Sequence, residues 1–429
     1  MNTETFIVLL GLGVVACGPA VDPAVLPADP RPIEGVFDPH GFPGATGIGV
    51  EPRGQFASAV PCDLDGDGLD DLVLTSNRDE APLHVVHGRT GVMDQRVSIT
   101  DVGTSIALDG DATLQCVGDL DGDGAEELSL CGHLGDRTAC RIARLAGDGS
   151  TLDDALELDL GPVAYPFYPT VQVLDLDADG TRDLFIDVPL WEQPMHYFVP
   201  NVAAELDAHV DPLDMDAVAH RVDGLAVERP EGSEGFIQQV HFADLDADGA
   251  TERIASYCPG PDGNCAYTDL LIGPHDPGAE DLLAPVPPVY TWSDIDPWIH
   301  VVTDVNGDGN DDILYSTFEE ETFIGFGPLD YARPLPSQSV QLFVQGELVT
   351  LGDINSDGIR DAAVTYVYGE NEGLTAELFG MSETPDAFAS FSLPGLVTVG
   401  PAGDFNGDGH ADFVVWDARG LVLIYGHPA

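Results

Sequence analysis

The sequence contains no lysine, and its fifteen basic residues, all arginines, face 75 acidic residues. The formal net charge of the 429-residue chain is −60 at pH 7. Nucleic acids and anionic membrane surfaces attract proteins through clustered cations, so we expect neither as a partner. The excess of carboxylates favours cations as partners instead. A solvated acidic surface, or adaptation to high salt, would give a similar composition.

Long hydrophobic runs are also lacking. The ten apolar residues 6–15 are too few to span a bilayer and have the length of a secretory signal core. They run into Ala16-Cys17, where a small residue precedes a cysteine, and this resembles the lipobox of bacterial lipoproteins. The resemblance implies a signal over residues 1–16, lipidation of Cys17, and a protein of the bacterial cell envelope, anchored to the outer membrane or secreted. Residues 1–5 carry no Lys or Arg, so a plain secretory signal stays an alternative.

Composition changes twice along the rest of the chain. Residues 17–44 contain seven prolines and little apolar periodicity, which predicts an extended tether. Residues 45–429 are rich in glycine, valine and leucine in short alternating runs, which is typical of β-sheet.

A nine-residue acidic pattern repeats along residues 45–429. The first copy, residues 63–71, reads Asp-Leu-Asp-Gly-Asp-Gly-Leu-Asp-Asp and is followed by an apolar run. The copies begin at Asp63, Asp119, Asp175, Asp244, Asp304, Asp353 and Asp404. Their spacing suits one four-stranded sheet per repeat. We therefore predict an all-β, seven-bladed β-propeller with one loop between the first two strands of each blade, closed by a strand near residues 45–50.

The chemistry of the loop predicts calcium binding. Positions 1, 3 and 5 are Asp or Asn and position 9 is Asp or Glu in every copy, which supplies hard oxygen ligands from one turn. Position 6 is always glycine, which tolerates positive φ, and the variable position 7 suits a backbone carbonyl ligand. Position 2 is always apolar and should fill the sheet interior beneath the loop. The predicted ligands of up to seven calcium ions are Asp63, Asp65, Asp67, Leu69, Asp71, Asp119, Asp121, Asp123, Ala125, Glu127, Asp175, Asp177, Asp179, Thr181, Asp183, Asp244, Asp246, Asp248, Ala250, Glu252, Asp304, Asn306, Asp308, Asn310, Asp312, Asp353, Asn355, Asp357, Ile359, Asp361, Asp404, Asn406, Asp408, His410 and Asp412.

Other interpretations of the loop fit less well. A helical calcium hand needs a bidentate Glu at position 12, which here holds Leu74, Leu130, Ile186, Ala255, Tyr315, Val364 and Val415. Transition metals are disfavoured because no Cys or His stands at a side-chain ligand position. Acidic turns without metal remain the alternative, although turns do not require alternating oxygens in seven copies.

The pattern Asp-x-Asp-Gly-Asp-Gly-x-x-Asp resembles the FG-GAP or VCBS-type repeat family, which includes the propeller of integrin α-subunits. The resemblance covers residues 45–429 and implies a calcium-binding propeller. The chain departs from the family because it has no Gly-Ala-Pro tripeptide and few Phe-Gly pairs. An integrin's ligand specificity is therefore not implied.

Six cysteines besides Cys17 fit an oxidising compartment and three disulfides. Cys131 with Cys140, and Cys258 with Cys265, each flank a turn where the second and third strands of a blade should meet. Cys62 and Cys116 would pair by elimination, or stay as two buried thiols. Zinc binding is disfavoured because neither close pair has the spacing of structural zinc ligands.

The sequence lacks the zinc-protease, nucleophile-elbow and phosphate-loop motifs, so we predict no catalytic residues. His133, His196, His241 and His300 are expected at the surface or in packing. Exposed aromatics bind sugars and proteins, and the face opposite the loops offers Tyr165, Phe167, Tyr168, Trp191, Tyr290, Trp292 and Trp298. We predict a monomeric binding or adhesion module for a protein or glycan. A polysaccharide lyase or hydrolase, or a structural subunit of an envelope complex, are the alternatives.

Overall fold

The computed structural model describes about three quarters of the chain. The described residues are 46–49, 56–76, 82–93, 96–108, 110–134, 137–147, 149–161, 169–188, 195–208, 213–214, 220–223, 236–258, 268–275, 288, 290–295, 299–316, 322–342, 347–354, 358–368, 373–380, 387–393, 396–417 and 420–426. The expected signal and tether, residues 1–44, lie outside them. Within the described part, no helix has the length and hydropathy needed to cross a bilayer.

The described chain is almost entirely β-strand, so the all-β prediction is confirmed. Its strands form seven sheets, numbered here in chain order. Sheet 1 contains β2 (Phe56–Cys62), β3 (Asp71–Ser76), β4 (Leu83–Val86) and β6 (Gly103–Ile106). Sheet 2 contains β7 (Gly110–Gly118), β8 (Glu127–Leu134), β9 (Arg137–Leu145), β10 (Leu152–Gly161) and β14 (Leu213–Asp214). Sheet 3 contains β11 (Thr170–Leu174), β12 (Asp183–Val188), β13 (Met195–Val199) and β15 (His220–Asp223).

The remaining sheets follow the same plan. Sheet 4 contains β16 (Phe236–Ala243), β17 (Glu252–Cys258), β18 (Thr268–Pro274) and β19 (Tyr290–Ile295). Sheet 5 contains β20 (Ile299–Thr303), β21 (Asp312–Ser316), β22 (Thr322–Gly325) and β23 (Ser339–Leu342). Sheet 6 contains β24 (Glu347–Gly352), β25 (Asp361–Tyr368), β26 (Gly373–Gly380) and β27 (Ala387–Leu393). Sheet 7 contains β28 (Leu396–Gly403), β29 (Asp412–Asp417), β30 (Gly420–Ile424), β1 (Thr46–Gly49) and β5 (Arg96–Ser98). The short helices described are α1 (Ile99–Val102), α2 (Val202–Ala208) and the 3-10 turn η3 (Leu335–Ser337).

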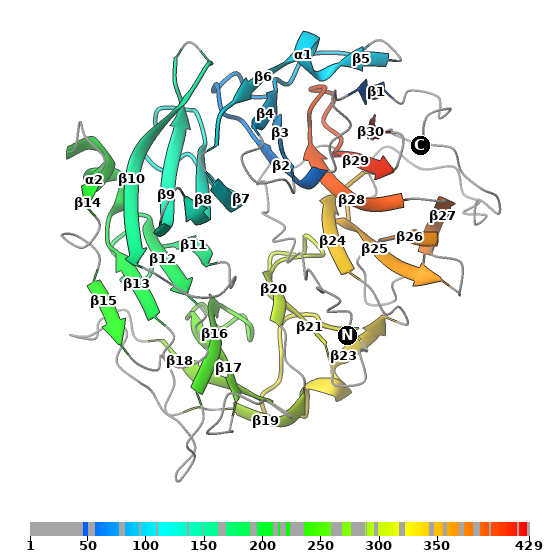
Figure 1. Ribbon diagram of the computed structural model, residues 1–429. Coiled ribbons are helices and arrows are strands. Elements are labelled where there is room, and N and C mark those ends of the chain that lie inside the picture. Colours follow the sequence, from blue (N-terminus) through cyan, green and yellow to red (C-terminus); the bar gives the residue numbers. More distant parts are fainter. Residues whose placement is uncertain are drawn as a thin grey trace, which may run out of the picture.

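The sheets follow one another around the molecule in chain order, and the first strand of each lies nearest the centre (Figure 1). Neighbouring strands are antiparallel except where β5 adds to β1 and β14 adds to β10. Short, acidic turns between successive strands explain this pattern, because a hairpin reverses the chain within a few residues.

The last sheet is completed by the beginning of the chain. β1 pairs antiparallel with β30, and Thr46 lies opposite Leu423. The sequence-based expectation that a strand near residues 45–50 completes the last repeat is therefore confirmed. The sequence did not predict that β5 would extend this sheet further.

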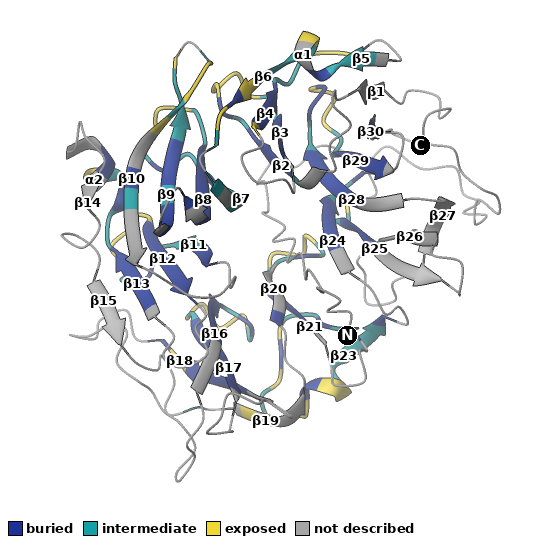
Figure 2. Ribbon diagram, in the orientation of Figure 1, coloured by how far each residue is buried: buried dark blue, intermediate teal, exposed yellow. Residues whose placement is uncertain are grey.

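The core lies between neighbouring sheets rather than in one central layer, and Figure 2 shows the buried strands with exposed loops at their ends. One cluster packs Leu72 and Leu74 of sheet 1 against Val414, Trp416 and Leu423 of sheet 7. Each fully buried aliphatic side chain contributes about 2 kcal/mol, so such contacts hold the first and last sheets together.

Candidate metal-binding loops

Each acidic repeat joins the first strand of a sheet to its second strand. Loop 1 (residues 63–71) links β2 to β3, and loop 2 (residues 119–127) links β7 to β8. The others are loops 3 to 7, residues 175–183, 244–252, 304–312, 353–361 and 404–412. Because every loop occupies the same place in its sheet, all seven end up at equivalent sheet edges.

The apolar residue at position 2 anchors each loop. Its exposed fraction is at most 7% in every copy: Leu64, Leu120, Leu176, Leu245, Val305, Ile354 and Phe405. The prediction that this residue fills the sheet interior is confirmed. Burial of position 2 fixes the start of the loop against the core while positions 3 to 6 stay at the surface.

Hydrogen bonds inside the loop turn the carboxylates toward a common centre. In loop 1, the Asp63 carboxylate accepts bonds from the N–H groups of Asp67 and Gly68, at 3.1 and 2.8 Å. The Asp67 N–H also lies 3.2 Å from Asp65 Oδ1, and the Leu69 N–H donates to Asp67 Oδ1 at 2.9 Å. The bond from position 6 to position 1 recurs in all seven loops.

Two backbone positions make this tight turn possible. The position 6 glycine has φ between +84° and +99° in all seven loops, where a side chain would be strained. Position 4 is also left-handed, even where it is Ala178 or Ala247, with φ of +56° and +57°. The sequence reasoning identified position 6 and missed position 4, because alanine in two copies hid the requirement.

Position 9 is the buried member of each loop. In loop 4, a Glu252 oxygen accepts the Leu245 N–H at 2.8 Å, and the same bond from position 2 to position 9 occurs in loops 1 to 6. Burial raises the pKa of Glu127, Glu252 and Asp312 to about 7 and that of Asp412 to about 8. Desolvation disfavours the charged form, so an added cation would relieve a real cost at this position.

The carboxylates converge closely enough to share one ion. In loop 4, ligand oxygens of Asp244, Asp246, Asp248 and Glu252 all lie within 4.8 Å of one another. Positions 1, 3 and 5 of loops 1 and 2 converge in the same way. Oxygen-only sets of this kind suit Ca²⁺, which takes six to eight oxygen ligands at about 2.3–2.6 Å. The donor chemistry therefore fits calcium at the loops that the sequence singled out.

Some predicted ligands have further roles or lie outside the described residues. The position 7 N–H donates to position 5 in the six loops where both are described. In loop 6, Asn355 and Asp357 lie outside the described residues. In loop 2, Arg144 Nη1 forms an ion pair with Asp121 Oδ2 at 2.7 Å, which partly neutralises that site.

One histidine beside loop 1 escaped the sequence reasoning. His87 Nδ1 lies 3.2 Å from Asp71 Oδ1 and 3.4 Å from Asp65 Oδ2, and the hydrogen bond to Asp71 raises the pKa of His87. His87 follows β4, on the third strand of its sheet, so its distance from the repeat concealed the contact. Loop 1 is therefore the copy in which a protein cation competes most directly for ligand oxygens.

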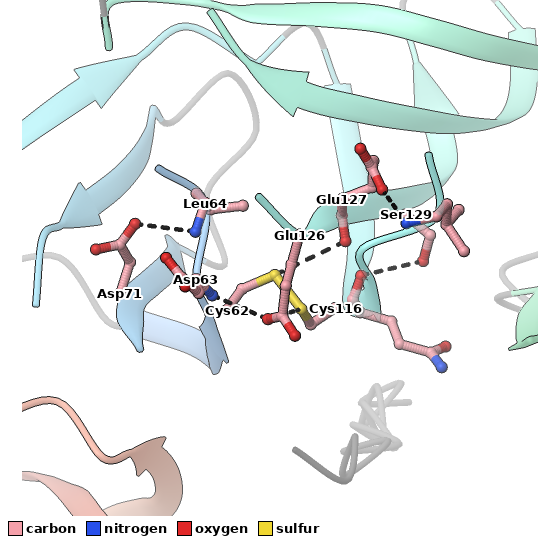
Figure 3. The surroundings of a disulfide bond; sticks show 10 residues. Cys62, Asp63, Leu64, Asp71, Cys116, Glu126, Glu127 and Ser129 are labelled. Carbon is pink, nitrogen blue, oxygen red and sulfur yellow. Dashed lines mark hydrogen bonds between the residues drawn. A yellow bond between two sulfur atoms is a disulfide. The ribbon is translucent and has the colours of Figure 1, made fainter. Parts of the chain in front are cut away.

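The structure contains two disulfide bonds among the described residues. Cys131 on β8 is joined to Cys140 directly opposite on β9. Cys62 on β2 is joined to Cys116 on β7, beside Asp63 and Glu126, so this bond ties sheet 1 to sheet 2 next to their loops (Figure 3). These are two of the three pairings expected. Cys265, the Cys258 side chain and Cys17 lie outside the described residues.

The aromatic face stays a prediction. Tyr165, Phe167, Tyr168, Trp191 and Trp298 lie outside the described residues. Tyr290 and Trp292 stand on β19 in the outer part of sheet 4, but their side chains also lie outside the description.

Two of the four histidines considered above are buried packing residues. His196 on β13 lies opposite Asp187 on β12, with 2.9 Å between Nδ1 and Oδ1. His241 on β16 is buried at the junction of sheets 3 and 4, and burial lowers its pKa to about 4. Neither residue is accessible to a substrate.

Comparison with known proteins adds no functional assignment. No protein-family model matches the chain, and no curated protein matches it. Among solved structures, the chain is similar to the core factor of S. cerevisiae, with a TM-score of 0.40 and 10% identity. The match covers 83% of this chain and 53% of the other, so the chain spans about half the length of that protein. A likeness this weak carries no inference about fold or function.

Proposed function

We propose that the protein is a seven-bladed, calcium-stabilised β-propeller that acts as an extracytoplasmic binding or adhesion module for a protein or glycan. The observation that carries this proposal is the convergence of four carboxylates in loop 4, in a pattern repeated in the sequence of all seven loops. The resemblance to FG-GAP and VCBS repeats supports the same assignment.

The propeller assignment is supported by contacts between the ends of the chain. β1 completes the sheet that contains β28 to β30, and sheets 7 and 1 share a hydrophobic cluster. Full closure removes exposed sheet edges, which otherwise invite aggregation. Seven sheets in one closed ring therefore account for both the repeat number and the pairing of the termini.

The role of calcium in this proposal is structural. Positions 1, 3, 5 and 9 hold 25 of the 75 acidic residues, and their mutual repulsion opposes folding until a cation neutralises it. An ion bound only by the folded state stabilises that state in proportion to the logarithm of its concentration. The ligand-binding surface then lies away from the loops, where the aromatic candidates stand. The predicted lipid on Cys17 would hold this surface at the bacterial envelope.

The proposal is tested by calcium binding and by ligand capture. Purified protein, cleared of metal with EDTA, should show a lower Tm, and Ca²⁺ should restore it while Mg²⁺ restores less. Equilibrium dialysis with ⁴⁵Ca²⁺ should find several ions per chain. A melting curve that is the same in EDTA and in Ca²⁺ contradicts the calcium assignment.

The binding role needs a separate measurement. Labelled protein is applied to arrays of glycans and envelope proteins, with Ca²⁺ or with EDTA. Capture of a defined class of ligand in Ca²⁺, lost on substitution of Trp292 by Ala, supports the role. Turnover of a polysaccharide without stable binding would favour the enzyme alternative instead.

A further inference from the structure

Position 8 of the loops has no place in the predicted ligand set, yet it makes a recurrent contact. Three loops carry an acid there, and each carboxylate accepts the main-chain N–H of position 1 in the preceding loop. The bonds run from Asp63 N to Glu126 Oε2 at 2.9 Å, from Asp244 N to Asp311 Oδ2 at 2.9 Å, and from Asp404 N to Asp70 Oδ2 at 2.7 Å. In the last of these, loop 7 is the loop that precedes loop 1.

Two loops carry an arginine at position 8, and it reaches the other end of the same residue. Arg182 Nη1 donates to the Asp119 carbonyl at 2.7 Å, and Arg360 Nη1 donates to the Asp304 carbonyl at 2.9 Å. Acids therefore hold the N–H of position 1 and arginines hold its C=O. The target is the same although the charge of the side chain is opposite.

The two remaining junctions are bridged by other groups. The Ala411 N–H, at position 8 of loop 7, donates to the Asp353 carbonyl of loop 6 at 3.2 Å. Between loops 3 and 4, His275 Nε2 lies 2.6 Å from the Leu176 carbonyl, which can only accept, so Nε2 carries the proton. Hydrogen bonds thus connect each loop to the next at all seven junctions.

We infer that the side chain at position 8 is a positioning residue for the calcium site of the preceding loop, so that each site depends on a residue of the neighbouring sheet. Position 1 is the residue whose carboxylate accepts the N–H groups of positions 5 and 6, so fixing its main chain fixes the centre of the loop. The inference rests on the proposed calcium binding.

Arg182 separates this role from simple electrostatics. Arg182 is exposed and belongs to loop 3, while its hydrogen bond goes to loop 2. If only charge mattered, removing a cation beside the loops would tighten calcium binding. If Arg182 positions Asp119, removing it loosens loop 2 and weakens binding there.

The experiment compares Arg182→Ala with the wild type in a calcium titration followed by NMR. The Gly124 amide reports loop 2, because its N–H donates to Asp119, and the Gly180 amide reports loop 3. We expect the Kd at Gly124 to rise about threefold to tenfold, the range for loss of one hydrogen bond, with Gly180 changed less. Arg182→Lys keeps a donor and the charge and should restore part of the affinity.

Arg360→Ala repeats the test at an independent junction, with Gly309 as the reporter of loop 5, and it decides the matter if Arg182→Ala does not fold. An unchanged or lower Kd at Gly124 and at Gly309 overturns the inference. If the wild-type protein binds no calcium at all, the proposed function fails rather than this step.

Discussion

The Asp70 carboxylate accepts a hydrogen bond from the main-chain N–H of Asp404 at 2.7 Å, although 334 residues separate the two in the chain. Close by, the N–H groups of Arg89 and Gly91 donate to the carbonyls of Phe405 and Asn406. The first and last repeats are therefore joined by the same kind of contact that joins successive repeats. The predictions below begin at this junction.

Substitution of Gly403 by Ala should weaken the junction between loops 7 and 1. Gly403 has φ of +62°, and a Cβ there would collide with the Asp70 carboxylate. The left-handed backbone costs about 1 kcal/mol in alanine, and the collision should add about 1–3 kcal/mol. Denaturant unfolding in EDTA measures the loss.

Gly91→Ala is the matched control for that substitution. Gly91 has φ of +89°, and a Cβ there would meet nothing within 4 Å. It should therefore show the backbone cost alone. Equal losses for the two variants would mean that the contact between Asp70 and loop 7 contributes nothing to stability.

The two disulfides should contribute unequally to stability. The bond between Cys62 and Cys116 closes a segment with a sequence separation of 54, against nine for Cys131 and Cys140. On the loop-entropy model, removal costs about 4 kcal/mol for the longer segment and about 2.5 kcal/mol for the shorter one. Paired Cys→Ala variants compared by urea unfolding check the order. A larger loss for the pair on β8 and β9 would argue against the loop-entropy account.

Calcium binding should release protons at neutral pH. The metal-free folded protein holds Glu252 and Asp312 with pKa values of about 7 and Asp412 with a pKa of about 8, each raised by burial. Because Ca²⁺ binds the ionised carboxylates, protons must leave these groups, and the apparent affinity should rise from pH 6 to pH 8. Calorimetric titrations at pH 7 in PIPES and in Tris, which differ in ionisation enthalpy, measure the release.

The same raised pKa values fix the pH dependence of the metal-free protein. A carboxyl whose folded pKa is raised contributes stability below its unfolded pKa, and this stability is lost as pH rises through the folded value. The Tm in EDTA should therefore fall between pH 5 and pH 8. Identical binding enthalpies in the two buffers, together with a flat Tm profile, would show that these carboxyls titrate normally.

His241 should make the protein sensitive to mild acid. Its folded pKa of about 4 lies below the model value of 6.5, so its stabilising contribution is present above pH 6.5 and is lost as pH falls toward 4. The full loss corresponds to about 3 kcal/mol. His241→Gln, which carries no charge at any pH, should lose less stability than the wild type between pH 7 and pH 4 in EDTA. Parallel profiles for the two proteins would locate the acid sensitivity elsewhere.

The sequence by itself determined the local structure of the loops. Ligands, the position 6 glycine and the position 2 anchor fall within nine residues, so their geometry follows from the turn and needs no information from distant segments. For the same reason, the loop's place between two strands could be predicted, as could the strand at residues 46–49, because a repeat short of one strand must find its partner at the other end of the chain.

Only the tertiary structure decided how the repeats contact one another. Asp70, Arg182 and His87 sit at variable positions, and their partners are set by the packing of separate strands and sheets rather than by spacing along the chain. The burial of His241 has the same origin, since its environment comes from sheet 3 as well as its own sheet. A nine-residue pattern fixes which oxygens can surround an ion. The register between sheets, which the repeat does not encode, fixes which side chain of the next repeat holds that loop in place.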